Sequence, residues 1–162
     1  MTRPEPMPLE PVAAPYIGFR HWHVVEDRLC SVGRHPLVDT RCPSGSGPPG
    51  RVEWPVKAIT ALPCANGPAP AIDCTCGIYA THTLRDPGSA WRSGPQYARH
   101  VIGAVVLWGR VVEHEWGYRG QYARPEGLLE GFAVETLAEA YGVPVLSAED
   151  LLARVGDARG GY

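Results

Sequence analysis

The chain has 162 residues, including 19 glycines and 17 prolines, and its formal net charge is −2. So many helix-breaking residues exclude a protein built from long helices, whereas 44% hydrophobic and 20% charged residues are typical of a globular domain. The near-neutral balance also excludes a globally basic surface that would attract nucleic acid or anionic lipid. No apolar run approaches the roughly 20 residues that span a bilayer. Because no signal-peptide pattern is present either, we expect a cytoplasmic protein with no membrane partner.

The composition divides the chain into three parts. Residues 1–15 are rich in proline, which favours an extended and disordered arm. Residues 16–156 carry the apolar patterns of a single folded domain, and residues 157–162 are expected to form a flexible tail.

The first predicted elements form a hairpin. Tyr16 to Val25 alternates bulky and polar side chains, as a half-buried strand does, and Glu26-Asp27 supplies a turn into a second strand from Leu29 to Val32. Cys30 lies within that second strand and is expected in the core. After a Gly/Pro/Ser-rich segment, Val52 to Leu62 is expected to form a strand, and Pro55 confines it to a sheet edge or a bend.

The strongest strand pattern runs from Val101 to Glu113, which is rich in β-branched and aromatic residues. Gly103 and Gly109 stand where a bulge or bend would curve this strand. His114 to Gly117 reads as a turn, and Tyr118 to Ala123 as the return strand. The two strands predict a central hairpin in a curved sheet.

The last third of the chain changes to helical spacing. Apolar residues from Leu128 to Tyr141, Phe132 among them, predict a core-facing helix that ends at Gly142. Ser147 begins a capping box for a final helix through Val155. We therefore expect an α+β fold in which a curved antiparallel β-sheet or small barrel carries one or two C-terminal helices and a zinc-stapled loop region.

The cysteines point to a metal. Five cysteines without an export signal favour metal binding or free thiols over a disulfide framework. Cys74 and Cys76 could hold one tetrahedral ion together with Cys64, and zinc is the natural occupant. We expect Cys42 to be the fourth ligand, with His82 or a water as alternatives. Ordinary buried thiols and a redox-active CxC remain open as other interpretations of the same spacing.

We expect this zinc to be structural, since its ligands lie in loops that could not otherwise bury enough apolar surface to become ordered. An open fourth position would instead indicate a catalytic zinc.

The turn of the central hairpin gathers polar groups. Glu113, His114 and Glu115 could act as general acids or bases, and a solvated hairpin tip is the simpler interpretation. Tyr118 and Arg119 are residue types enriched at interface hot spots. We therefore predict a binding role for Tyr118, Arg119 and His114, and no catalytic residue.

Two further groups have plain structural interpretations. His21 and His23 could share a metal, but on a strand they are expected to be exposed polar positions. The tryptophans at 54, 108 and 116 are expected to pack in the core.

Several motifs occur together in a recognisable order. They are Cys64, the run CTCGIYA from Cys74 to Ala80, the run WGRVVEH from Trp108 to His114, the tripeptide from Gly117 to Arg119, and Ala123. This arrangement resembles an uncharacterised family of proteins from actinobacteria and their phages, in which a C…CxCGIYA segment precedes a WGxVVxHxxGYR hairpin. The resemblance brings no established activity with it.

The resemblance extends over about Tyr16 to Val145. Members of the family often have a histidine between the first cysteine and the CxC, whereas the interval here (ANGPAPAID) contains none. The segment from Arg34 to Gly50 is also longer than is usual in the family. Both departures agree with Cys42 standing in for the missing histidine.

The sequence thus predicts a zinc-stabilised, non-enzymatic binding module that acts through a protein partner. One alternative is a zinc-dependent hydrolase or transferase with an open metal position. The other is a nucleic-acid-binding accessory protein that uses arginines and tryptophans, which the net charge supports only weakly.

Overall fold

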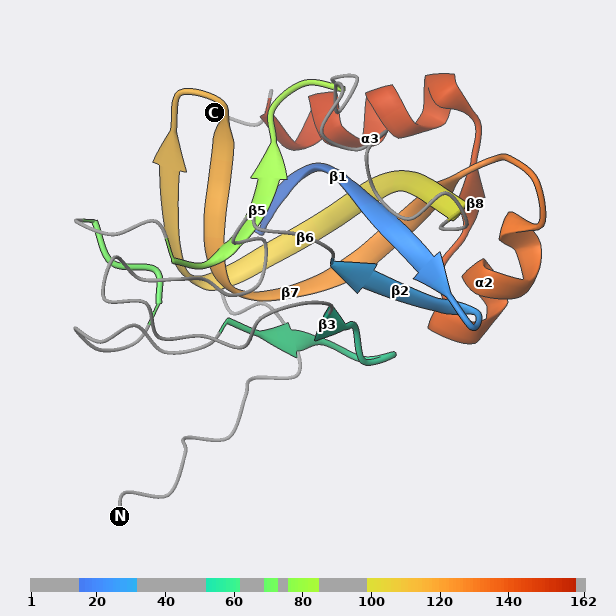
Figure 1. The fold of residues 1–162 in the computed structure, drawn as a ribbon. Coiled ribbons are helices and arrows are strands. Elements are labelled where there is room, and N and C mark those ends of the chain that lie inside the picture. Colours follow the sequence, from blue (N-terminus) through green and yellow to red (C-terminus); the bar gives the residue numbers. More distant parts are fainter. Residues whose placement is uncertain (1–14, 32–51, 62–68, 73–75, 85–98, 160–162) are drawn as a thin grey trace, which may run out of the picture.

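The computed structural model describes residues 15–31, 52–61, 69–72, 76–84 and 99–159 (Figure 1). The expected arm therefore lies almost wholly outside the described residues. The elements are β1 (Tyr16–Val25), β2 (Arg28–Ser31), β3 (Val52–Glu53), β4 (Ile59–Thr60), β5 (Ile78–Thr81), β6 (Arg99–His114), β7 (Gly117–Leu129), α2 (Val134–Tyr141), β8 (Val145–Leu146) and α3 (Ala148–Arg159).

Four strands close into a ring. Strand β1 pairs with β6, β6 with β7, β7 with β5, and β5 again with β1, and every one of these pairs is antiparallel. The last pair is short, because Phe19 opposite Thr81 is its single registered position. The Thr81 hydroxyl lies between two acceptors here, the Thr83 carbonyl at 2.9 Å and the Phe19 carbonyl at 3.3 Å. The predicted α+β fold, with a mostly antiparallel sheet and two short C-terminal helices, is confirmed (Figure 1).

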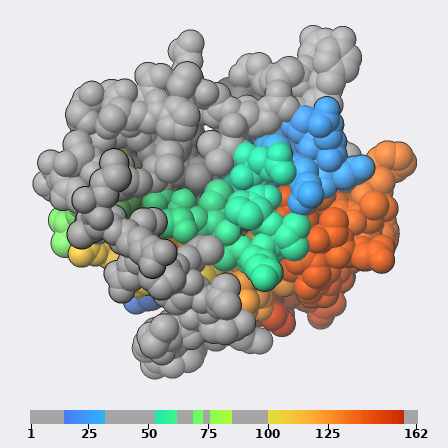
Figure 2. All heavy atoms as spheres, turned by 90° about the horizontal axis from the view of Figure 1, so that it is seen from below, coloured from blue at the N-terminus to red at the C-terminus, as the bar shows by residue number. Residues whose placement is uncertain are grey.

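Short strands extend the ring on its outer edges. Strand β2 continues from β1, β3 pairs with β2, β4 pairs with β7, and β8 joins β7 in parallel. The β1–β2 turn uses Glu26 and Asp27 at φ values of 48° and 58°. Positive φ at both turn residues is the conformation that two-residue hairpins favour. The predicted hairpin is therefore confirmed. The single strand expected from Val52 to Leu62 is wrong, because this segment forms two short strands, β3 and β4, that pair with different partners. Residues 52–61 lie across one face of the molecule, beside the hairpin and α2 (Figure 2).

Strand β6 is long, with 16 residues, and its pairing with β7 is irregular near Gly103 and Gly109. Its register against β7 shifts between Ala104 and Val105 and again between Trp108 and Val111. Gly109, inside the second shift, has φ 77°, so a side chain there would be strained. The predicted bend at this position is confirmed.

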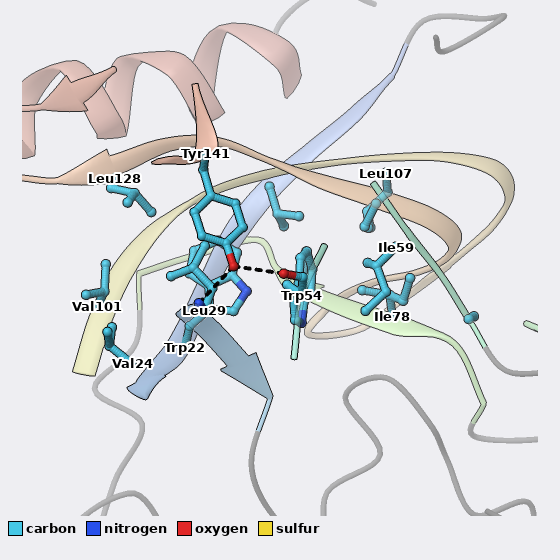
Figure 3. Packing of buried hydrophobic residues seen from close by; sticks show 14 of the residues in the cluster. Trp22, Val24, Leu29, Trp54, Ile59, Ile78, Val101, Leu107, Leu128 and Tyr141 are labelled. Carbon is cyan, nitrogen blue, oxygen red and sulfur yellow. Dashed lines mark hydrogen bonds between the residues drawn. The ribbon is translucent and has the colours of Figure 1, made fainter. Parts of the chain in front are cut away.

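The main core lies between the ring, the 52–61 segment and α2 (Figure 3). Trp22 and Trp54 meet edge to face with their ring centroids 5.4 Å apart. The Tyr141 hydroxyl donates to the Trp54 carbonyl at 2.8 Å and accepts the Leu29 amide at 3.0 Å (Figure 3). Helix α2 is thereby joined to β2 and to the segment after β3.

Helix α3 covers another face of the sheet, where Leu151 and Val155 pack with Phe19 and Ala104. The Ser147 hydroxyl accepts the Asp150 amide at 3.1 Å, as the capping pattern predicted. The helix continues to Arg159, within the segment expected to be a flexible tail. Over the residues described here, neither helix is long and apolar enough to span a membrane.

The predicted start of the first C-terminal helix is wrong. Strand β7 continues to Leu129, because Leu128 pairs with β6 on one side and with Val145 of β8 on the other. The helix begins only at Val134. Phe132 lies between β7 and α2 and is 88% exposed, so it is not one of the core-facing residues that the helical spacing predicted.

Candidate functional site

The predicted zinc site lies mostly outside the described residues. Cys42, Cys64 and Cys74 belong to segments that the structure does not describe. Cys76, just before β5, is buried with 1% of its surface exposed. Within the ranges that are described, no three His, Cys, Asp or Glu side chains are placed to hold a metal ion. The four-cysteine zinc site therefore stays a prediction, and a buried thiol at Cys76 is compatible with it.

Arg119 binds both flanks of the segment that contains Cys74. Its Nη1 donates to the Cys76 carbonyl at 3.0 Å and to the Ala71 carbonyl at 3.2 Å. The side chain is only 7% exposed and lies on β7 opposite Tyr79 of β5. Arg119 is therefore placed to position the backbone around the CxC motif rather than to form an exposed contact.

The packing around the Cβ of Arg119 is tight. Gly77, which follows Cys76, has φ 123°, and a Cβ added there would lie 3.2 Å from the Cβ of Arg119 and 3.1 Å from that of Pro70. A glycine after the CxC motif thus lets the chain pass closely over β7.

The tip of the β6–β7 hairpin is a two-residue turn formed by Glu115 and Trp116. The predicted turn is confirmed, since His114 and Gly117 are registered partners. The Trp116 N–H donates to Nδ1 of His114 at 3.4 Å, and the Trp116 carbonyl accepts the His82 amide at 3.0 Å. The expectation that Trp116 packs in the core is wrong, because it is 51% exposed. The tip therefore presents an exposed indole, and the backbone N–H and carbonyl of the same residue are both hydrogen-bonded.

His114 fixes the conformation of this tip. Because its Nδ1 accepts a hydrogen bond, the proton of the neutral imidazole is assigned to Nε2. Burial lowers the pKa of His114 below its usual value, and the positive charge of Arg119 lowers it further. The neutral form that the turn needs is thus the favoured form near pH 7.

A second group of side chains lies beside the tip. Nε2 of His82 is 3.3 Å from Oε1 of Glu113. The His82 ring also meets the ring of Tyr118 edge-on, at 4.7 Å between centroids, and Tyr118 packs on Tyr16 at 5.1 Å. Tyr118 is buried, so the predicted binding residue lies inside an aromatic stack.

The other sequence expectations have mixed outcomes. Cys30, Trp54 and Trp108 are buried as predicted. His23 was expected at an exposed position, but it is buried and its ring lies 4.3 Å from that of His100. That prediction is wrong because the strand face that carries His23 is covered rather than solvated.

Sequence reasoning missed a buried arginine in β1. Arg20 donates through Nη1 to the Tyr79 carbonyl at 2.5 Å and through Nη2 to the Ser31 hydroxyl at 2.7 Å. Its guanidinium lies 4.6 Å from the ring centroid of Trp54, whose indole N–H also donates to Ser31. The available signal was the alternation of β1, which places Arg20 on the same face as Trp22.

These features define an α+β protein with a closed ring of four antiparallel strands and a hairpin tip held by the His114 side chain and the His82 backbone amide. Searches against protein-family models, curated proteins and solved structures find no match to the chain.

Proposed function

We propose that the protein is a zinc-stabilised, non-enzymatic interaction module that binds a protein partner through the tip of the β6–β7 hairpin. The observation that carries the proposal is Trp116, which is 51% exposed although both its backbone N–H and its carbonyl are hydrogen-bonded. Tryptophan is enriched at interface hot spots, and an indole on a restrained backbone loses little conformational entropy on binding.

The residues predicted to bind a partner take different parts in this proposal. His114 holds the turn through its hydrogen bond to Trp116. Tyr118 and Arg119 are buried beneath the tip, and Arg119 joins it to the segment around Cys74 and Cys76. These three residues would orient the surface, while Trp116 would make the direct contact.

Zinc is proposed at Cys42, Cys64, Cys74 and Cys76, where it would supply structural order. The support is the burial of Cys76 and the contact of Arg119 with the backbone on both sides of Cys74. A metal bound to thiolates in this region would couple the loops to β7, because Arg119 belongs to that strand.

Affinity capture with the full chain tests the interaction surface. Trp116→Ala should reduce recovery of the specific partner at least tenfold, because it removes the exposed indole from a turn without opening the core. Phe132→Ala is the matched control, since Phe132 is also an exposed aromatic and lies outside this hairpin. Equal recovery with the wild type and Trp116→Ala would refute the proposal.

A further inference from the structure

The conformation of the hairpin tip depends on the protonation state of one side chain. The backbone N–H of Trp116 donates to Nδ1 of His114 at 3.4 Å. An imidazole nitrogen accepts a hydrogen bond only while it carries no proton, and both nitrogens of the charged ring are donors. We propose that His114 is a pH-sensitive switch, which holds the tip while its ring is neutral and releases the Trp116 backbone when its ring is protonated. This inference rests on the proposed function and adds its regulation, because the same tip is the proposed binding surface.

The charged ring of His114 would have no suitable place within the turn. Its Nδ1 proton would be directed at the Trp116 N–H, so that two donors would oppose each other. Its Nε2 atom is buried and, among the described residues, has no hydrogen-bond partner. A buried donor without an acceptor is costly, whereas a hydrated donor is not. Since His114 is only partly buried, its ring can turn toward solvent without opening the core.

The surroundings of His114 keep its ring neutral near pH 7. Titratable or charged groups lie around it on three strands, and they are Glu113 of β6, Tyr118 and Arg119 of β7, Tyr79 of β5, and His82 just after β5. Burial is the largest influence and lowers the pKa of His114, and the charges of Arg119 and His82 lower it further. The Tyr118 backbone and the Glu113 carboxylate act in the opposite direction, and the net shift of the pKa is downward from 6.5. The switch therefore operates on acidification, below pH 6.5.

A second attachment of Trp116 does not depend on charge. Its carbonyl accepts the backbone amide of His82 at 3.0 Å. The His82 ring lies beside Glu113, with Nε2 3.3 Å from Oε1, and this contact becomes an ion pair when the ring is protonated. Acidification would thus break one of these two backbone hydrogen bonds of Trp116 and preserve the other. We expect a local release of the turn, with β6 and β7 still paired.

Asparagine provides a matched variant that does not titrate. One residue separates His114 from Trp116, and an asparagine at that spacing accepts the same backbone N–H in an Asx turn. His114→Asn should therefore hold the tip at every pH. His114→Ala should leave the tip released at every pH, because alanine offers no acceptor.

An NMR pH titration of the full ¹⁵N-labelled chain tests the switch, with the proton as the probe. In the wild type, the ring nitrogens of His114 should report a neutral ring that carries its proton on Nε2 at pH 7.5, and a midpoint below pH 6.5. Across that midpoint, the hydrogen-exchange protection factor of the Trp116 amide should fall about tenfold, as expected for the loss of one hydrogen bond. The amide of Leu107, which is buried in β6 between two paired strands, should keep its protection.

The variants and the reference amide decide the outcome. His82→Gln keeps the backbone amide that holds the Trp116 carbonyl, so the loss of protection at Trp116 should remain in this variant. The switch is overturned if the Trp116 amide keeps its protection while His114 is protonated, or if His114 stays neutral down to pH 4.5. It is also overturned if His114→Asn shows the same loss as the wild type, or if the loss disappears in His82→Gln. A parallel loss of protection at Leu107 would show unfolding of the hairpin and would overturn the switch as well.

Partner capture separates this inference from the proposed function. Capture at pH 7.5 that does not depend on Trp116 refutes the proposed function, whereas the NMR titration still decides whether the tip switches. Below the midpoint, capture should fall about tenfold with the wild type, in step with the lost hydrogen bond, and should persist with His114→Asn. Capture that depends on Trp116 but responds equally to pH in both chains would leave the interaction module standing and overturn its regulation by His114.

Discussion

Two buried arginines join distant parts of this chain through backbone carbonyls. Arg20 connects β1 to β5 at the Tyr79 carbonyl, and Arg119 connects β7 to the chain on both sides of Cys74. Guanidinium is suited to this role because its donors are fixed in one plane and point to several acceptors at once. The sequence shows two arginines in strands, but their burial depends on which strands close the ring.

Arg119→Lys should destabilise the protein even though it keeps the charge. A lysine cannot reproduce the planar set of donors, and one or more buried carbonyls would lose a partner, which costs about 1–3 kcal/mol. Urea unfolding should show a lower midpoint for this variant, and zinc binding should weaken with it. The exposed Arg110→Lys is the control, and an unchanged midpoint for Arg119→Lys would contradict the assigned role.

His114 should make stability depend on pH. Its pKa is lower in the folded chain than the usual value of 6.5, so the unfolded chain binds more protons just below that pH. Its contribution to the free energy of unfolding is therefore complete above pH 6.5 and is lost as the pH falls towards the folded pKa.

His114→Asn isolates this effect, because asparagine offers an oxygen to the Trp116 N–H but does not titrate. The loss of stability between pH 7.5 and pH 5.5, measured by urea unfolding, should be smaller in His114→Asn than in the wild type. Identical losses would show that His114 does not titrate as described.

At the scale of elements, local sequence patterns predict the hairpins better than they predict where strands and helices begin and end. The strand pattern of β1, the Glu26-Asp27 turn and Gly109 of β6 are local signals, and the structure confirms a strand, a turn and a bend at these positions. The alternation of β1 does not predict its burial, because both of its faces are covered. The helical spacing from Leu128 predicted the start of the helix too early. Strand β7 continues to Leu129 because it pairs with β6 and β8, and these long-range interactions cannot be recognised in a short stretch of sequence.

The candidate site was predictable only in part for the same reason. The turn between His114 and Gly117 is a local feature, and the sequence identified it. The exposure of Trp116 and the burial of Tyr118 depend on β5 and on His82, which follows that strand and lies more than thirty residues earlier in the chain. Residue types at the tip therefore indicated a site without showing which side chain faces solvent.

Gly103→Ala should strongly destabilise the hairpin of β6 and β7. A Cβ at Gly103 would lie 2.2 Å from the Gly127 carbonyl oxygen, so the two backbones would have to separate. Overpacking of this kind costs about 1–3 kcal/mol or more. Gly156→Ala is the control, since a Cβ there meets nothing within 4 Å, and in helix α3 it should stabilise by a few tenths to about 1 kcal/mol. Equal thermal midpoints for the two variants would contradict this account of β6.

At the scale of the whole molecule, the ring, the two helices and the cysteine segment support one another. Helix α2 is joined to β2 through Tyr141, and α3 covers β1 and β6 with Leu151 and Val155. The CxC region is linked to the same framework through Arg119. We propose that a zinc ion orders this region and that the hairpin tip binds the partner protein.

Native mass spectrometry of the full chain, purified without chelator, tests the central claim most directly. We predict one zinc ion per chain, held by four thiolates, and its loss in Cys74→Ser and Cys76→Ser together with a lower melting temperature. Fewer thiolate ligands on a bound zinc would instead favour the alternative of an open, catalytic metal position. A chain that carries no zinc, and whose melting temperature is the same with and without chelator, would contradict the account.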